Sequence, residues 1–145
     1  KVLYVSVKVD GAEFTSSYLD GLIIATHTGS TAYALSAGGS LLDPRLNGFE
    51  IVPLNPFVGT GIFRPLLVPM EAIIEIKLQR PRLNGLVIID GQREFKVAPE
   101  VNIKIQRAET DISFIRFKDQ VVGYFDKLRR KILFNRQLTD NSPEN

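Results

Sequence analysis

Short segments of alternating apolar and polar residues, each bounded by a turn signal, constrain the fold of this chain more than any other feature. Successive side chains of a strand point to opposite faces of a sheet, so this pattern is typical of strands buried on one face. We expect strands at residues 1–9, 14–18, 22–26, 49–53, 66–68, 73–78, 86–89, 94–97, 101–106 and 112–117. The sequence therefore predicts a mainly β chain, an antiparallel β-sandwich of about nine or ten short strands.

Dipeptides typical of tight turns lie between several of these segments. Asp10-Gly11 and Asp90-Gly91 each join two predicted strands. Such a pair readily adopts the two positive φ angles that a tight hairpin turn requires. We therefore expect a β-hairpin at Asp10-Gly11 and a turn between two strands at Asp90-Gly91.

Two segments depart from the strand pattern. Residues 27–39 are dominated by small side chains, and Ser30 or Thr31 could cap a helix that ends at Gly38-Gly39. We expect a tight loop there, followed by a short helix of about two turns. Apolar residues recur at helical spacing in residues 119–133, which predicts an amphipathic helix. We expect one β domain over residues 1–134, including this helix, and a polar tail at 135–145.

The composition excludes several classes of protein. The 145 residues include no cysteine, which excludes disulfides, iron–sulfur centres and cysteine nucleophiles. A Ser-His-Asp triad would need His27, the single histidine. The net charge of +2 is too small to indicate nucleic acid as the main partner. The apolar runs fall short of the roughly 18–20 residues that a membrane-spanning helix needs.

The loop at residues 26–31, THTGST, is the best candidate for a binding site. It offers a glycine, several hydroxyl groups and backbone N–H groups at a helix start, which together suit an anion or a hydroxyl-rich ligand. Asp20 could accept hydrogen bonds from a ribose or an amide, and Tyr33 could stack and donate a hydrogen bond. The loop lacks the ending of a Walker A sequence. The alternative is a well-capped helix whose hydroxyl groups satisfy only its own backbone.

The stretch DGLIIATHTGSTAYALSAGG, residues 20–39, closely resembles the signature segment of NAD kinases. The resemblance continues through Asp43-Pro44, the stretch PLNPF at 53–57, the stretch FRPLLVP at 63–69 and the stretch DGQ at 90–92. It covers most of residues 1–133. Members of this family transfer a phosphate from ATP, or from inorganic polyphosphate, to the 2′-hydroxyl of the adenosine ribose of NAD, and so make NADP.

The resemblance implies that this chain is the C-terminal half of such an enzyme. The family's N-terminal α/β domain carries a GGDG motif and an Asn-Glu pair, and neither occurs here. The chain also begins at Lys1, and its single methionine is Met70. We therefore expect a longer natural protein, with ATP or polyphosphate and Mg²⁺ in the full-length enzyme. We expect no catalytic residue and no metal ligand in this chain, and an isolated chain that is inactive.

Individual residues match positions that hold NAD in the family. Asp20 matches the aspartate of the family's GDG motif, although Leu19 replaces its first glycine. Asn55 and Phe57 stand where the family usually has Cys and His. His27 replaces a proline, and we interpret it as a loop histidine rather than as an acid–base catalyst. The full set of expected NAD-binding residues is Tyr18, Asp20, Thr28, Thr31, Ala32, Tyr33, Ala34, Leu35, Ser36, Asn55, Phe57, Asp90 and Gln92.

The segment around Tyr33 also approaches NAD bound by a neighbouring subunit in this family, so the resemblance implies a homodimer or a homotetramer. We further expect a cytoplasmic protein that binds NAD and NADP and contacts neither nucleic acid nor membrane. Two other functions stay open: an NAD(P)- or nucleotide-binding module without kinase activity, and a lipid-kinase-like domain. The GSTAY residues argue against the lipid kinase.

Overall fold

The computed structural model describes residues 2–57, 63–79, 84–113, 115 and 120–130. The chain divides into two compact units, Lys1–Glu109 and Thr110–Asn145. The first unit carries all the described strands, and the second carries the helix α2 (Gln120–Leu128). None of the described helices is long and apolar enough to cross a membrane. The predicted domain boundary at residue 134 lies outside the described residues and stays a prediction.

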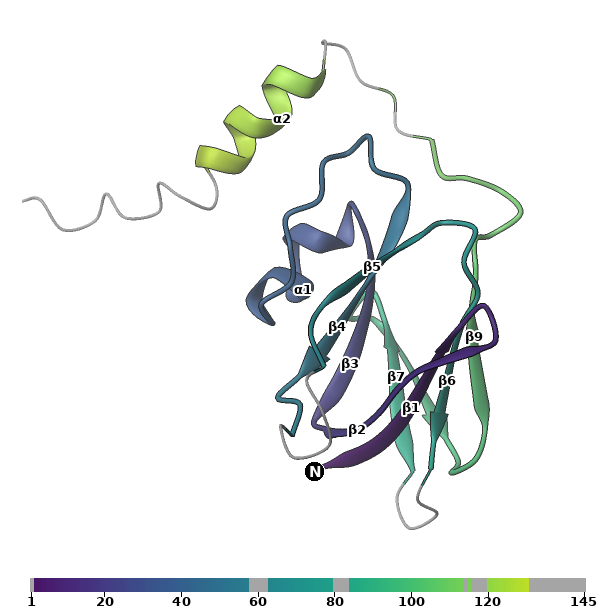
Figure 1. The fold of residues 1–145 in the computed structure, drawn as a ribbon. Coiled ribbons are helices and arrows are strands. Elements are labelled where there is room, and N and C mark those ends of the chain that lie inside the picture. The colour runs from purple at the N-terminus through teal and green to yellow at the C-terminus, as the bar shows by residue number, and fades with distance from the viewer. Residues whose placement is uncertain (1, 58–62, 80–83, 114, 116–119, 131–145) are drawn as a thin grey trace, which may run out of the picture. The chain divides into compact units, whose positions relative to one another are not determined.

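The described residues form nine strands in three antiparallel sheets (Figure 1). A four-stranded sheet has the order β2-β1-β6-β9, a three-stranded sheet has the order β3-β4-β5, and β7 pairs with β8. The prediction of a mainly β, antiparallel fold is confirmed. The strands are β1 (Leu3–Val9), β2 (Ala12–Leu19), β3 (Gly21–Thr26), β4 (Gly48–Leu54), β5 (Leu66–Pro69), β6 (Ile74–Leu78), β7 (Gly85–Ile89), β8 (Arg93–Val97) and β9 (Asn102–Ile105).

The predicted hairpin and the predicted turn are both present, and the turn also joins two antiparallel strands. Asp10 and Gly11 have φ angles of 50° and 79°, and they join β1 to β2. Asp90 and Gly91 have φ angles of 51° and 67°, and they lie between β7 and β8. Two successive residues with positive φ match the right-handed twist of the flanking strands, which explains why these dipeptides are reliable signals.

One predicted strand is not observed in the residues that are described. The strand expected at 112–117 is absent at Ile112, Ser113 and Ile115, which lie in irregular backbone. The remaining residues of that segment lie outside the described part of the chain. The amphipathic helix expected at 119–133 is present as α2, and the part of the prediction beyond residue 130 lies outside the described residues. The other predicted strands each overlap an observed one.

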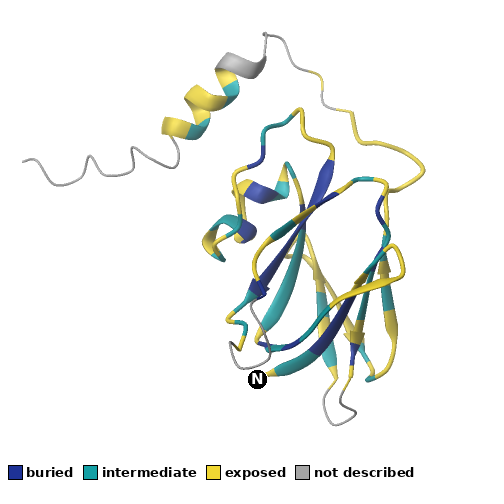
Figure 2. Cartoon of the chain, in the orientation of Figure 1, coloured by how far each residue is buried: buried dark blue, intermediate teal, exposed yellow. Residues whose placement is uncertain are grey.

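The hydrophobic core lies between the four-stranded and the three-stranded sheets (Figure 2). Val7 of β1, Ile74 of β6 and Ile51 of β4 are fully buried in it. A second, smaller cluster joins Ala25, Ala34 and Val52 on the other face of β3 and β4. Strand β4 is therefore buried on both faces. The packing of Ala34 against Ala25 and Val52 positions the segment that follows β3.

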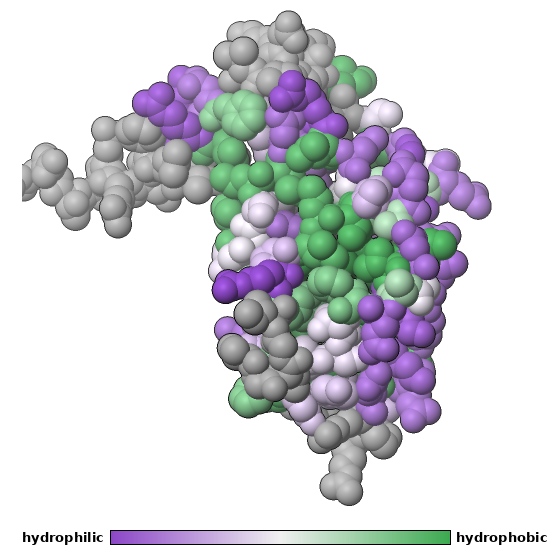
Figure 3. Space-filling view, in the orientation of Figure 1, coloured by the Kyte–Doolittle hydropathy of each residue, from purple (hydrophilic) through white to green (hydrophobic). Residues whose placement is uncertain are grey.

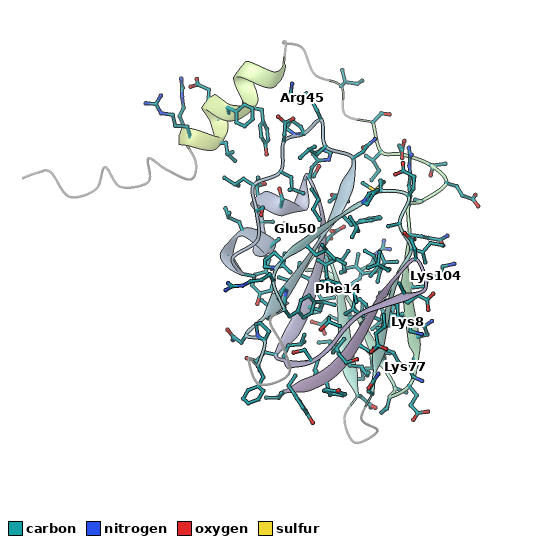
Figure 4. The ribbon with its side chains drawn as sticks, viewed as in Figure 1. Lys8, Phe14, Arg45, Glu50, Lys77 and Lys104 are labelled. Atoms are coloured by element: carbon teal, nitrogen blue, oxygen red, sulfur yellow. The ribbon has the colours of Figure 1, made fainter. Side chains whose placement is uncertain are left out.

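Lysine and glutamate side chains alternate across the strands of the four-stranded sheet. Lys8 pairs in register with Glu75, which pairs in turn with Lys104 (Figure 4). Glu75 also accepts a hydrogen bond from Asn102 Nδ2 over 2.9 Å. Opposite charges on facing positions favour this pairing, so the lysines are interleaved with acidic groups rather than gathered into a basic patch.

Hydrophobic side chains also reach the surface of the first unit. Figure 3 shows a hydrophobic area in the middle of the viewed face, where Figure 4 labels Phe14. The Phe14 ring is 43% exposed and meets the ring of Phe63 edge-on, with 5.6 Å between the ring centres. Phe63 is buried, so this contact links the end of the core to the surface.

Candidate functional site

The corner between β2 and β3 brings together Asp20 and Asn55, two of the residues expected to bind NAD. Asp20 lies between the two strands, and its backbone N–H donates to the Leu54 carbonyl over 2.9 Å. Asn55 follows β4, and its Nδ2 donates to Asp20 Oδ2, also over 2.9 Å. Asn55 has a φ of 45°, a left-handed conformation that asparagine tolerates better than most residues. This conformation turns the chain at the end of β4, beside Asp20.

Two expected aromatic residues lie at the same corner. The Phe57 N–H donates to the Tyr18 carbonyl over 2.7 Å, which fixes the segment after Asn55 against the end of β2. The Tyr18 ring packs against Tyr4, with 4.5 Å between the ring centres, and the Phe57 side chain is 61% exposed. An ionised carboxylate only accepts hydrogen bonds, and an exposed ring can stack on a base. The corner therefore has the chemistry to hold a ribose hydroxyl and an aromatic ring.

Gly21 allows β3 to approach the end of β4 closely. A Cβ at this position would lie 2.9 Å from Leu54 Cδ1, closer than such atoms normally come. Gly21 pairs with Leu54 in the β3–β4 register. A larger side chain at this position would therefore have to displace the end of the Leu54 side chain.

The segment after β3 is shorter in its helical part than expected. A single 3₁₀ turn, η1 (Gly29–Thr31), precedes a one-turn helix, α1 (Tyr33–Ser36). The predicted capping was wrong, because Thr28 and Ala32 occupy the two cap positions and neither makes a side-chain cap hydrogen bond. A helix of one turn leaves too few aligned peptide dipoles to attract an anion on its own. Gly38 has a φ of 84°, as expected for a glycine that ends a helix.

This segment presents most of its expected binding residues to the surface. Thr28, Thr31, Ala32, Tyr33 and Ser36 are exposed, and the Tyr33 side chain reaches 65% exposure. Leu35 is half-buried, and Ala34 is buried against Ala25 and Val52. The side chain of Ala34 therefore faces the protein, so this residue could meet a ligand only through its backbone.

The expected site residues fall into three separate groups. Asp20 precedes β3 and the segment containing Thr31 follows it, so these two groups lie at opposite ends of a strand roughly 17 Å long. Asp90 and Gln92 lie in the turn of the two-stranded sheet, where Gln92 N–H donates to the Ile89 carbonyl over 3.0 Å. The corner is therefore the only group in which hydrogen bonds between expected site residues from distant parts of the described chain are observed.

His27 contacts its neighbour in the same loop. Its Nε2 lies 3.3 Å from Thr28 Oγ1, and its carbonyl accepts a hydrogen bond from Ser30 Oγ over 2.7 Å. Both contacts are local, which fits the interpretation of a loop histidine. Sequence reasoning did not single out Ser30 or Glu50 as site residues, although both are buried beneath this segment. A glutamate inside an otherwise apolar strand is the one signal that could have identified Glu50.

Asp43 and Arg45 form an ion pair in the loop between α1 and β4. Arg45 Nε and its second guanidinium nitrogen donate to the two Asp43 carboxylate oxygens over 2.9 and 2.7 Å. These hydrogen bonds lower the pKa of Asp43 to about 2. Among the described residues, no group of three or more His, Cys, Asp or Glu side chains is arranged to hold a metal ion. The described residues therefore offer no cluster of side chains that could hold Mg²⁺ by themselves.

Comparison with known proteins shows that this chain is similar to NAD kinases. The family model described as "ATP-NAD kinase C-terminal domain" matches residues 1–117. The NAD kinase of Methanosarcina mazei is 33% identical over 132 residues, which are 91% of this chain and 44% of that protein. The NAD kinase of Methanoregula boonei is 39% identical over 132 residues, which are 91% of this chain and 47% of that protein.

Two solved structures are similar over most of the chain. An NAD kinase from Archaeoglobus fulgidus in complex with ATP has a TM-score of 0.76 and 34% identity, and the match covers 89% of this chain and 49% of that one. Yeast NADH kinase complexed with NADH has a TM-score of 0.69 and 27% identity, and the match covers 97% and 42% of the two chains. The chain spans about half the length of the curated relatives it matches.

Proposed function

Because the chain belongs to the family of ATP-NAD kinase C-terminal domains, we propose that it is the β domain that holds NAD in an NAD kinase. The complete enzyme transfers a phosphate to the 2′-hydroxyl of the adenosine ribose of NAD, with ATP or polyphosphate as donor. Relatives with this name match nine-tenths of the chain. A cytoplasmic location stays a prediction.

The contact between Asp20 and Asn55 is the observation that carries this proposal. The Asn55 amide engages one carboxylate oxygen of Asp20 and leaves the carboxylate exposed to solvent. Asp20 then accepts a hydrogen bond from a hydroxyl of the bound nucleotide, and Asn55 keeps the carboxylate in place. Phe57, whose ring is exposed beside them, offers a surface on which a base or a nicotinamide ring stacks.

The segment containing Thr31 and Tyr33 lies too far from this corner along β3 for both groups to contact the same part of one small ligand. We therefore propose that the two groups hold different parts of NAD, or NAD molecules in neighbouring subunits. The second arrangement requires a homodimer or a homotetramer. Sedimentation of the chain at high concentration tests it, and a monomer at every concentration argues against shared sites.

Phosphoryl transfer depends on positioning and on charge neutralisation, and needs no covalent intermediate on the protein. In this chain the positioning falls to Asp20, Asn55 and the exposed segment after β3. Mg²⁺, when bound in the complete enzyme, neutralises phosphate charge. The acceptor ribose is held by this domain, and the donor is held elsewhere.

Calorimetric titration of the 145-residue chain with NAD tests the binding role. Asp20→Ala should weaken NAD binding about tenfold, because loss of a charge-assisted hydrogen bond costs about 1.5 kcal/mol or more. Glu109→Ala, which removes an exposed carboxylate at the end of the first unit, is the matched control. Equal affinity in Asp20→Ala and the unchanged chain would overturn the assignment.

Activity distinguishes the kinase domain from a module that only binds nucleotide. We expect no phosphorylation of NAD by the chain alone with ATP and Mg²⁺, and phosphorylation by the natural protein that contains it. A natural protein that binds NAD and transfers no phosphate from ATP or polyphosphate would support the binding-only function.

A further inference from the structure

The chain after α1 donates hydrogen bonds to two buried polar side chains, Glu50 of β4 in the three-stranded sheet and Ser30 of η1. The Ser40 N–H donates to Glu50 Oε1 over 2.5 Å, and the Leu42 N–H donates to Ser30 Oγ over 3.3 Å. Ser30 is fully buried, and Glu50 is 1% exposed. Residues 40–42 have no regular secondary structure, so these side chains supply acceptors that a sheet or helix would otherwise provide.

Glu50 lies in the middle of β4, on the face that is covered by α1. It pairs with Ala25 of β3, and both Ala25 and Val52 pack against Ala34 of α1. Gly39 leaves room for the carboxylate, because a Cβ there would lie 3.0 Å from Glu50 Oε2 and 2.7 Å from the Ala34 carbonyl oxygen. The glycine that ends the segment and the buried glutamate therefore fit together.

Ser30 connects the two ends of the same segment by hydrogen bonds. Its hydroxyl donates to the His27 carbonyl over 2.7 Å while it accepts from Leu42 N–H. One buried side chain thus joins the loop before η1 to the chain after α1. Residues 31–33 lie between the attachments made by Ser30 and Glu50, and all three are exposed. The two attachments lie on the buried side of the segment, so its exposed side is available to a ligand.

We propose that Ser30 and Glu50 are positioning residues, which hold residues 40–42 against η1 and β4 and thereby fix the exposed Thr31–Tyr33 surface in the form that binds NAD. This inference rests on the proposed function for its ligand, but the fastening itself does not. Neither residue needs to touch NAD. Their role is to reduce the conformational freedom that the segment would lose when NAD binds.

The hydrogen bond from the Ser40 N–H requires an acceptor oxygen on residue 50, and it does not require a negative charge. Oε1 accepts the Ser40 N–H, whereas Oε2 has no hydrogen-bond partner in the described part of the chain. Glu50→Gln retains an oxygen that can accept from Ser40, and Glu50→Leu removes it at similar size. The glutamine variant should therefore rescue what the leucine variant loses.

Amide hydrogen exchange of the 145-residue chain tests the fastening directly. In Glu50→Leu we expect the Ser40 amide to exchange at least tenfold faster, and in Ser30→Ala we expect the same of the Leu42 amide. Glu50→Gln should leave both rates within about twofold of the unchanged chain. Unchanged protection of Ser40 in Glu50→Leu and of Leu42 in Ser30→Ala would overturn the proposal.

NAD titration of the same variants tests the consequence for binding. We expect Glu50→Leu and Ser30→Ala to weaken binding about tenfold and Glu50→Gln to bind like the unchanged chain. Ile51→Val, which trims a fully buried side chain on the opposite face of β4, is the control for lost stability. The positioning role is overturned if Ile51→Val weakens NAD binding as much as Glu50→Leu or Ser30→Ala does at an equal loss of Tm. It is also overturned if these two variants exchange faster but bind NAD with unchanged affinity. If the unchanged chain binds no NAD, the proposed function fails, and the exchange rates still decide whether the fastening exists.

Discussion

Asn55 donates a hydrogen bond from Nδ2 to Oδ2 of Asp20, although 35 positions separate the two residues in the sequence. A backbone hydrogen bond joins the same two segments, since the Asp20 N–H donates to the carbonyl of Leu54. The antiparallel pairing of β3 with β4 brings the start of one strand to the end of the other. Two residues that look unrelated along the chain therefore form one unit.

Asp20→Ala and Asn55→Ala should show coupled effects on stability, because each removes one partner of this hydrogen bond. We expect a coupling free energy of about 0.5–1 kcal/mol, because both side chains are exposed and water competes for the hydrogen bond. Urea unfolding of the two single variants and the double variant measures this quantity. Strictly additive losses would show that the hydrogen bond contributes nothing in solution.

The left-handed backbone of Asn55 gives a second prediction. Asn55→Gly should lower the free energy of unfolding only by the lost hydrogen bond to Asp20, about 0.5–1 kcal/mol, because glycine adopts a φ of 45° freely. Asn55→Val should lower the free energy of unfolding by about 1–3 kcal/mol, since a β-branched residue is strained there. Thermal unfolding of both variants provides the comparison, and equal Tm values would contradict the conformation.

Gly39→Ala should destabilise the first unit by about 1–3 kcal/mol, because overpacking forces its neighbours to move. The added methyl group would approach the Ala34 carbonyl oxygen to 2.7 Å and Val52 Cγ2 to 3.0 Å. Gly123→Ala is the control, since a Cβ at that position of α2 has nothing within 4 Å. We expect the control to be neutral or slightly stabilising, as alanine favours helices. A Gly39→Ala variant as stable as the control would refute the close packing.

The ion pair between Asp43 and Arg45 predicts how stability depends on pH. Its hydrogen bonds lower the pKa of Asp43 from 3.8 to about 2 in the folded chain. The pairing therefore stabilises the fold above about pH 4, and this contribution is lost as the pH falls toward 2. In Arg45→Gln the pKa of Asp43 should return toward its ordinary value. Titration of the Asp43 carboxyl carbon by NMR measures both pKa values, and equal values would exclude the pair.

The sequence predicts the strands and hairpins well, because their signals are local. Asp10-Gly11 carries its own turn preference, and the alternation around Val7 reports which face is buried. The one-turn α1 was harder to predict, because its small residues are compatible with a longer helix. Its length is set by contacts with β4, through Ala34 and the turn at Gly38.

The corner and the buried attachments were predictable to different degrees. Resemblance to a family singled out Asp20 and Asn55, but strand register is what brings them together. The positive φ of Asn55 has no signal in a single sequence. Glu50 stands out as the one charged residue of β4, but its burial depends on the cover supplied by residues 34–40.

The attachment of residues 27–42 from beneath separates two tasks within one short segment. Ser30, Ala34 and Glu50 hold its inner side, whereas Thr31 and Tyr33 face outward and contribute little to that hold. Substitutions on the outer side should therefore cost the fold little stability. Under the proposed function, single changes there could alter the preference between related nucleotides, while the inner side keeps the fold.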